Sequence, residues 1–342
     1  MKNEKLKIKN EGKIFRILDA NLNRATEGLR VVEEVCRFIL EDAKLALEAK
    51  QLRGRLSKVV RHELSSRDSA GDVGRAPYTK NEQSRSGLEN IFKANIKRAE
   101  EAVRCLEEFS KLLKASYGKA FKAIRFEIYE LEKELTPRLA KALKLDFDLY
   151  VITDGSKDPL PTARRAIAGG VRIVQYRDKQ AGKKAYLATA RKLAALTRKS
   201  GTALILNDHW DLVREAGADG VNVGQEDLGK TSLAEIRKQV GADAIVGVSV
   251  SNLSQALRAQ KLGADYLGVG PIFSTPLKKT DKIVGLSELK RIVGKIKIPV
   301  VAIGGIDRGN IRKVLASGCS RIAAIRAAGE LTSERARLWH GL

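Results

Sequence analysis

Long apolar runs are missing from this sequence of 342 residues. No stretch approaches the roughly 18 consecutive apolar residues that a membrane-spanning helix needs. The first residues, MKNEKLKIKNEGK, are charged and lack the apolar centre of a secretory signal peptide. We therefore expect a cytoplasmic protein with no membrane partner, whose apolar residues, 43% of the total, bury a core.

Cysteine and histidine are scarce as well, with three residues of each. Cys36, Cys105 and Cys319 are far apart and odd in number, so the sequence indicates neither a disulfide framework nor a paired-cysteine metal site. Cys36 and Cys105 fall on apolar helix faces, where cysteine behaves as a small buried hydrophobe. The histidines share no ligand spacing, which argues against a histidine-bound metal.

Acidic residues are outnumbered, 41 against 64 Lys and Arg, which gives a formal net charge of +23. Such an excess favours anionic partners such as nucleic acid, membrane surfaces or phosphorylated small molecules. The basic residues are scattered and mixed with acidic ones, and no helix-turn-helix, KH or RRM pattern is present. We therefore favour a solvated basic surface, with nucleic-acid binding as the alternative.

Two halves with different hydrophobic periods make up the chain. Residues 1–140 show the 3.6-residue period of helices, whereas residues 147–342 alternate short apolar runs with amphipathic stretches. Between them lies TPRLAKALKLDFDLY, in which Pro137 is expected to stop or kink a helix. We predict an all-α helical domain followed by an α/β domain.

An internal repeat organises the helical half. Ala20–Glu34 and Ala94–Glu108, offset by 74 residues, are identical at eight of fifteen positions. This predicts two helical hairpins related by a pseudo-twofold axis. Asn21 and Asn95 fall at the same place in an otherwise apolar face, where a buried polar group must be hydrogen-bonded. The charged residues of the repeat lie mostly on the opposite side, so the repeat is either a ligand site built twice or a solvated face with i,i+4 pairs such as Arg30–Glu34. The polar segment 65–87 between the hairpins is either functional or a connector.

Eight apolar runs follow in the second half. They are LYVIT, RIVQY, ALILN, GVNVG, AIVGVSV, YLGVG, PVVAIG and RIAAI, and helical stretches separate them. Eight strand–helix units predict a (β/α)8 TIM barrel, with a doubly wound sheet as the alternative. In such a barrel the active site lies at the C-terminal ends of the strands.

Polar residues gather at these predicted strand ends. In chain order they are Gln175, Arg177, Lys179, Asn207, Asp208, Asp227, Ser249, Thr275, Lys278, Gly304 and Gly305. The cations Arg177, Lys179 and Lys278 suit phosphate oxygens. Asp208 and Asp227 are a natural Mg²⁺ pair, and the two glycines can offer backbone N–H groups to a phosphate. The set predicts Mg²⁺ and two phosphorylated substrates, one of them a diphosphate.

These segments resemble the thiamine-phosphate synthase family. The resemblance rests on LYVITD, VQYRDK, LILNDHWDLVREAGADGVNVGQEDL, GVSVSN, GADYLGVGPIFST and IPVVAIGGI. It implies coupling of a hydroxymethylpyrimidine diphosphate with a thiazole phosphate, or its carboxylated form, to give thiamine phosphate and diphosphate. Diphosphate would leave the exocyclic methylene of the pyrimidine before the thiazole nitrogen attacks, so no protein nucleophile is needed.

The resemblance also implies roles for individual residues. Asp208 and Asp227 would hold Mg²⁺, while Arg177, Lys179 and Lys278 would act catalytically on the departing diphosphate. The substrate-binding set would be Gln175, Tyr176, Arg177, Asp178, Lys179, Asn207, Ser249, Thr275, Pro276, Leu277, Lys278, Gly304, Gly305, Ile325 and Arg326. Within it, strand alternation points Tyr176 and Asp178 away from Gln175, Arg177 and Lys179.

Two departures from the family pattern lie on the thiazole side. The loop after the sixth strand usually reads Thr-x-Thr-Lys, whereas here Leu277 replaces the second threonine. The end of the eighth strand usually reads Ile-Ser-Ala, whereas here Arg326 stands in the middle. Arg326 would either supply a charged contact to the thiazole phosphate or point away from it.

The helical half resembles a domain that is found fused to such synthases and is associated with hydroxymethylpyrimidine-phosphate kinase activity. The resemblance rests on the two repeat copies and on DVG at 72–74. It implies ATP as a further partner, although no P-loop or Gly-rich nucleotide motif is present. The rival hypothesis is an oligomerisation or interaction module that would make the chain a homo-oligomer.

Overall fold

The computed structural model describes residues 2–60, 87–275 and 283–333. Pro276, Leu277 and Lys278, together with most of the segment 65–87, lie outside the described residues. The chain divides into two compact units, Met1–Ala142 and Leu143–Leu342. The described helices include none that is both long enough and apolar enough to cross a membrane.

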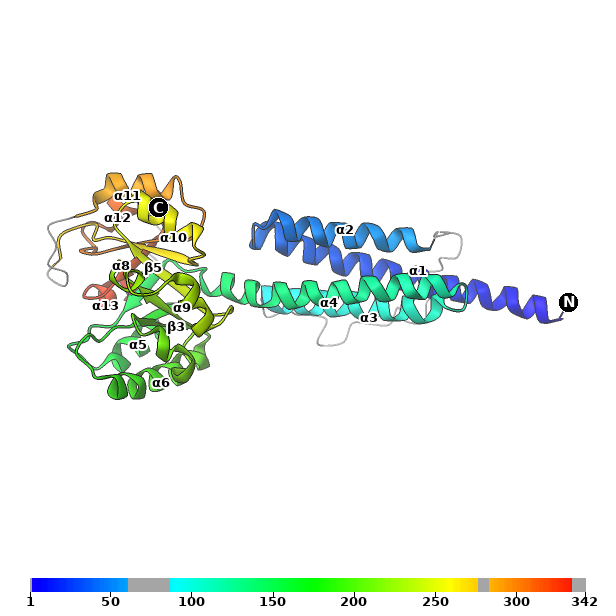
Figure 1. Cartoon of the computed structure of the whole chain (residues 1–342), viewed down its shortest axis with the longest axis horizontal. Coiled ribbons are helices and arrows are strands. Elements are labelled where there is room, and N and C mark those ends of the chain that lie inside the picture. Colours follow the sequence, from blue (N-terminus) through cyan, green and yellow to red (C-terminus); the bar gives the residue numbers. More distant parts are fainter. Residues whose placement is uncertain (1, 61–86, 276–282, 334–342) are drawn as a thin grey trace. The chain divides into compact units, whose positions relative to one another are not determined.

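The first unit is built from long helices (Figure 1). They are α1 (Lys2–Glu34), α2 (Ala43–Val59), α3 (Leu88–Ser110) and α4 (Ala115–Lys144), with a π-helical turn η1 (Val35–Ile39) after α1. The carboxylate of Asp42 caps α2 by accepting from the backbone N–H groups of Lys44 and Leu45. Of the two outcomes expected for Pro137, a stop is excluded, because α4 continues through it, with Leu135 and Leu139 buried on either side.

The repeat is visible in matching contacts. Asn21 donates to the carbonyl oxygen of Ile17 at 2.8 Å, and Asn95 donates to that of Ile91 at the same distance. Each amide is therefore satisfied by its own helix, as a buried polar group requires. The helices α1 and α3 approach closely, since a Cβ on Gly28 would lie 2.6 Å from the carbonyl oxygen of Asn95.

The second unit contains eight parallel strands within the described residues, and they close into a barrel in the order β1 to β8. The strands are β1 (Leu149–Ile152), β2 (Ile173–Tyr176), β3 (Ala203–Asn207), β4 (Gly220–Val223), β5 (Ile245–Val250), β6 (Tyr266–Val269), β7 (Val300–Ile303) and β8 (Arg321–Ala324). Because β1 pairs with β8, the predicted TIM barrel is confirmed and the doubly wound sheet is excluded.

Helices cover the outside of this barrel and connect its strands (Figure 1). They are α5 (Pro159–Ala168), α6 (Lys183–Ser200), η3 (Trp210–Leu212), α7 (Val213–Ala216), α8 (Gln225–Leu228), α9 (Leu233–Val240), α10 (Leu253–Lys261), α11 (Gly285–Val293), α12 (Ile311–Leu315) and α13 (Ala328–Ser333). A large apolar cluster lies between strands and helices, and a smaller one fills the barrel interior. The packed interior leaves chemistry to the barrel ends.

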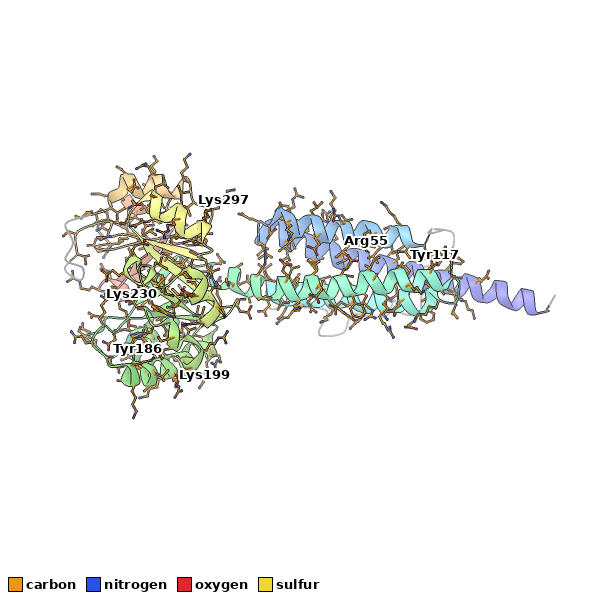
Figure 2. The ribbon with its side chains drawn as sticks, viewed as in Figure 1. Arg55, Tyr117, Tyr186, Lys199, Lys230 and Lys297 are labelled. Atoms are coloured by element: carbon orange, nitrogen blue, oxygen red, sulfur yellow. The ribbon has the colours of Figure 1, made fainter. Side chains whose placement is uncertain are left out.

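Lysine side chains on the barrel unit are largely exposed. Figure 2 shows Lys199, Lys230 and Lys297 on its outside, and each is exposed to solvent. On the helical unit, Arg55 pairs with Glu127 through two hydrogen bonds of 2.6 and 2.7 Å. These positions fit a solvated basic surface in which part of the charge is neutralised by local ion pairs.

Candidate active site

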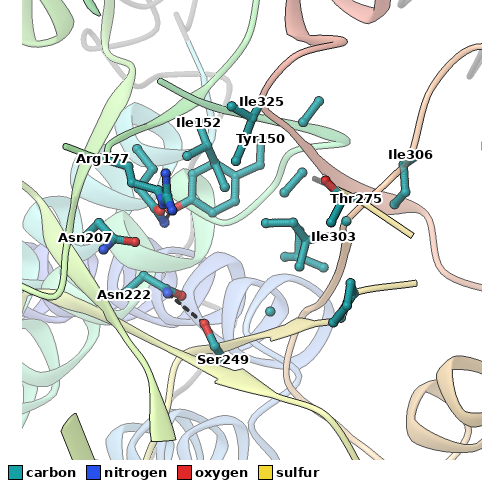
Figure 3. A pocket seen from close by; sticks show the side chains of 18 of the residues that line it. Tyr150, Ile152, Arg177, Asn207, Asn222, Ser249, Thr275, Ile303, Ile306 and Ile325 are labelled. Atoms are coloured by element: carbon teal, nitrogen blue, oxygen red, sulfur yellow. Dashed lines mark hydrogen bonds between the residues drawn. The ribbon is translucent and has the colours of Figure 1, made fainter. Parts of the chain in front are cut away.

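A cavity of about 830 Å³ lies where the C-terminal ends of the barrel strands meet. Of the residues predicted for the site, those that line it are Gln175, Arg177, Lys179, Asn207, Asp208, Asp227, Ser249, Thr275, Gly304, Gly305, Ile325 and Arg326. Figure 3 shows several of these side chains together, among them Arg177, Asn207, Ser249 and Thr275. Residues that are far apart in the sequence are thus gathered around one space.

Two predicted residues lie away from the cavity lining. The ring of Tyr176 is buried between the barrel strands and the surrounding helices, where it stacks on Tyr186 with 4.3 Å between the ring centroids. The carboxylate of Asp178 accepts from the backbone N–H groups of Gln180 and Ala181, which shapes the loop after β2. The geometry gives these two side chains structural contacts and offers their predicted substrate-binding role no support.

A pair of carboxylates forms the acidic side of the cavity. Burial and the nearby carboxylate of Asp227 raise the pKa of Asp208, while Lys179 opposes that shift. Asp208 has a φ of +64°, a strained value for a residue with a side chain, and its backbone N–H donates to the carbonyl oxygen of Asn222 at 2.9 Å. Asp227 accepts from the backbone N–H of Gly224 at 2.8 Å. The backbone of Asp208 and the carboxylate of Asp227 are therefore held in place.

This donor set fits a divalent cation. Two carboxylates that repel one another in a half-buried cavity would be relieved by a shared positive ion. Among the described residues no group of three or more His, Cys, Asp or Glu could hold a metal. A Mg²⁺ bound by Asp208 and Asp227 would therefore take its remaining ligands from water and substrate oxygens, as that ion commonly does.

Three cations line the cavity. Arg177, Lys179 and Arg326 form no ion pair with any of the residues that the structure describes. Elsewhere in the chain, basic side chains are commonly paired, for example Arg237 with Asp265 and Lys144 with Asp219. Cations left unpaired in a cavity are suited to phosphate oxygens.

The turn after β7 brings backbone to the opposite side of the cavity. Gly304 and Gly305 have φ values of +98° and +66°. A Cβ on Gly304 would lie 2.6 Å from the Cβ of Pro271, and one on Gly305 would lie 2.6 Å from the carbonyl oxygen of Ser274. Only glycine therefore fits both positions. Asn310 holds the turn by donating to the carbonyl oxygen of Gly305 at 2.7 Å.

Polar residues inside the strands also reach the cavity, and a search of strand ends misses them. Tyr150, Asn222 and Tyr266 line its floor and are buried. The signal that could have found them is a polar or phenolic residue within an apolar strand, as in LYVI and GVNV. Buried polar groups of this kind require hydrogen-bond partners, and their partners here are other cavity residues.

Comparison with known proteins connects this geometry to a family. The family model described as thiamine monophosphate synthase matches residues 149–328, and that of the ThiD2 family matches residues 16–134. A thiamine-phosphate synthase of Nostoc punctiforme is 40% identical over 315 residues, which are 92% of this chain and 89% of the relative.

A second relative and a solved structure carry the same kind of name as the first relative. A thiamine-phosphate synthase of Thermosynechococcus vestitus is 41% identical over 319 residues, 92% of this chain and 90% of its own. The solved structure of a thiamine phosphate pyrophosphorylase from Pyrococcus furiosus is 35% identical with a TM-score of 0.53, and covers 58% of this chain and 98% of its own. The resemblance seen in the sequence is thus confirmed, and the chain belongs to the thiamine monophosphate synthase family.

Proposed function

We propose that the barrel cavity couples a hydroxymethylpyrimidine diphosphate to a thiazole phosphate, which gives thiamine phosphate and diphosphate. The observation that carries the proposal is the joint placement of unpaired cations, a carboxylate pair and a glycine turn around one cavity. Cations and carboxylates together suit a diphosphate with its metal, and the glycine turn suits a second phosphate. The family's transferase activity agrees with this assignment.

The diphosphate would lie between the ends of β2 and β4. In this pose Arg177 and Lys179 bind its oxygens, and Asp208 and Asp227 face it with Mg²⁺. Mg²⁺ would neutralise charge that develops on the leaving diphosphate. Lys278, which lies outside the described residues, would add a further cation from the loop after β6.

The two rings would meet in the middle of the cavity. Asn207 would contact the pyrimidine, and Thr275 would line the thiazole phosphate near Gly304 and Gly305. As the methylene carbon–oxygen bond breaks, the aminopyrimidine stabilises the positive charge, and the thiazole nitrogen then forms the new carbon–nitrogen bond. Unpaired Arg177 and Lys179 stabilise the departing charge without first breaking a protein ion pair. Arg326 would give the thiazole phosphate a charged partner.

Coupling by the full chain tests this proposal. The chain supplied with both substrates and Mg²⁺ should form thiamine phosphate, and Asp208→Ala should abolish the Mg²⁺-dependent reaction. Asp211→Ala is the matched control, because Asp211 lies three residues away and pairs with Lys183 outside the cavity lining. Undiminished coupling by Asp208→Ala would remove this residue from the metal site.

For the helical unit we propose a kinase that phosphorylates hydroxymethylpyrimidine phosphate with ATP. The support is the ThiD2 match over residues 16–134 and the fusion to a barrel that would consume the product. The test uses the full chain carrying Asp208→Ala, so that coupling is off, with the pyrimidine monophosphate, ATP and Mg²⁺. ADP release is expected. A folded chain that releases no ADP and is oligomeric by light scattering would favour the interaction module instead.

A further inference from the structure

A continuous hydrogen-bonded chain crosses the floor of the cavity. Gln175 donates to the hydroxyl of Tyr150 at 2.8 Å, and that hydroxyl lies 2.9 Å from the hydroxyl of Tyr266. Tyr266 donates to Oδ1 of Asn222 at 3.1 Å, and Nδ2 of Asn222 donates to Oγ of Ser249 at 3.0 Å. The chain thus links β2, β1, β6, β4 and β5, and Figure 3 shows its last bond.

The donors in this chain all run one way. Tyr266 has a single hydrogen and gives it to Asn222, so the hydrogen between the two tyrosines must come from Tyr150. Burial raises the pKa of both tyrosines, so each keeps its hydrogen at neutral pH. Each hydroxyl in the middle of the chain therefore both accepts and donates.

The direction of the chain decides what its two ends can offer. Ser249 accepts from Asn222, and no described residue accepts the hydrogen of Ser249 in return. That hydrogen is therefore available as a donor in the cavity, where an anionic oxygen could accept it. At the other end Gln175 has used its amide as a donor, which leaves its carbonyl oxygen as an acceptor.

The barrel makes specific room for this arrangement. A Cβ at Gly247 would lie 2.0 Å from the ring of Tyr266 and 2.4 Å from its hydroxyl oxygen. Gly247 therefore leaves the space that the tyrosine ring occupies, although it sits inside a strand, where glycine is unfavourable. Gln175, Tyr150 and Tyr266 are each at most 3% exposed, so the bonds of these three residues are shielded from water that could replace them.

We propose that Tyr150, Tyr266 and Asn222 are positioning residues that hold Ser249 as a donor and Gln175 as an acceptor toward one bound substrate. This inference rests on the proposed function, in which the diphosphate and the ring of that substrate occupy the same cavity. A donor at one end suits a diphosphate oxygen, and an acceptor at the other end suits the amino group of the pyrimidine. The hydrogen-bonded chain couples its two ends, because reversing the direction of one hydrogen bond reverses the direction of all the others.

Asn222→Asp tests the direction of the chain. A carboxylate only accepts, so Ser249 would have to donate to it and could no longer donate to substrate. We expect kcat/KM to fall about 10- to 100-fold at neutral pH, the loss typical of one hydrogen bond to a charged group.

Ser249→Ala separates this effect from simple charge repulsion. Ser249→Ala should lower kcat/KM at neutral pH about as much as Asn222→Asp does. The double variant should be no worse than either single variant, because both remove the same donor. Losses that multiply would overturn the proposal.

Tyr266→Phe breaks the chain without adding a charge, and Thr202→Val is its control. Thr202 is also buried, and its hydroxyl donates to the carbonyl oxygen of Val171. Thr202 lies just before β3, at the opposite end of that strand from the cavity. We expect about a 10-fold loss of kcat/KM for Tyr266→Phe and less than about 2-fold for Thr202→Val, with similar changes in Tm. Equal kinetics for the two variants would overturn the proposal.

A binding measurement keeps this inference separate from the proposed function. If the unsubstituted chain forms no thiamine phosphate, the proposed function fails. Calorimetry with inorganic diphosphate and Mg²⁺ then decides the inference. Weaker binding by Asn222→Asp and Tyr266→Phe, but not by Thr202→Val, supports it, whereas equal binding by all three variants rejects it.

Discussion

Asp208 combines backbone strain with an unfavourable charge. Its φ of +64° is rare for a residue other than glycine, and burial and Asp227 raise its pKa. A carboxylate whose pKa is raised by folding stabilises the fold only while protonated, so this contribution is lost as pH rises through the folded pKa. At neutral pH the ionised side chain of Asp208 therefore lowers the stability of the fold, although its position in the cavity suits a bound cation.

Asp208→Asn should separate stability from activity. Asparagine tolerates a positive φ and carries no charge, so at neutral pH without Mg²⁺ we expect the Tm to rise by about 2–4 °C, the shift that about 1 kcal/mol causes in a domain of this size. Coupling should be lost, and added Mg²⁺ should raise the Tm of the unsubstituted chain only. A variant less stable than the original at neutral pH would contradict this account. Thermal scans with and without Mg²⁺ measure both effects.

Gly305→Ala tests the turn after β7. The added Cβ would lie 2.6 Å from the carbonyl oxygen of Ser274 and would displace the turn that lines the cavity. We expect KM for the thiazole phosphate to rise at least about 10-fold, with a smaller effect on the pyrimidine diphosphate.

Gly263→Ala is the control for that substitution. Gly263 also has a positive φ, +89°, but nothing lies within 4 Å of its missing Cβ. It should lose stability through the same backbone strain while keeping both KM values. Equal KM changes in the two variants would show that strain alone, rather than displacement of the phosphate turn, is responsible.

At the scale of elements, the repeat extends to buried ion pairs. Glu33 in α1 and Glu107 in α3 are 74 residues apart, and both are buried. Glu33 accepts from Arg53 of α2 at 2.9 Å, and Glu107 accepts from Arg125 of α4 at 2.8 Å. Each hairpin is thus joined internally by the same kind of contact, although the arginines are not at equivalent positions in the repeat.

Glu107→Gln should destabilise the helical unit by about 2–4 kcal/mol, because removing one charge leaves the partly buried Arg125 without its carboxylate partner. Glu108→Gln, next in sequence but exposed, should leave the unfolding temperature unchanged. Circular dichroism at increasing temperature measures both. Equal unfolding temperatures for the two variants would contradict the assignment of Glu107 as a structural contact.

Helices and strands with a clear hydrophobic period could be predicted from the sequence. Polar residues inside strands, and a helix that continues through proline, could not. The eight strands follow from hydrophobic spacing and the repeat from identical residues, and the predicted strand ends indicated Arg177, Asp208 and Gly305. Tyr150, Asn222 and Tyr266 were missed because they lie within strands, where only three-dimensional contacts show which polar groups meet. The continuation of α4 through Pro137 depends on tertiary burial of its neighbours, which overrides local propensity.

At the scale of the whole molecule, the net charge of +23 should act on small anions rather than on nucleic acid. Exposed lysines such as Lys199 and Lys297 are spread over the surface, while the cations of the cavity are unpaired. We expect KM for both phosphorylated substrates to rise with salt, because screening weakens the attraction. Retention on DNA or RNA at about 0.15 M salt should be absent; salt-sensitive micromolar binding would support the rival hypothesis.

Closure of the barrel has a consequence for synthesis on the ribosome. The last strand, β8, lies between β7 and β1, so β1 keeps an open edge until Arg321–Ala324 has been made. Open edges of parallel strands are sites of aggregation. A chain interrupted before Ala324 should therefore be insoluble or captured by chaperones, because the barrel can close only after β8 has been translated.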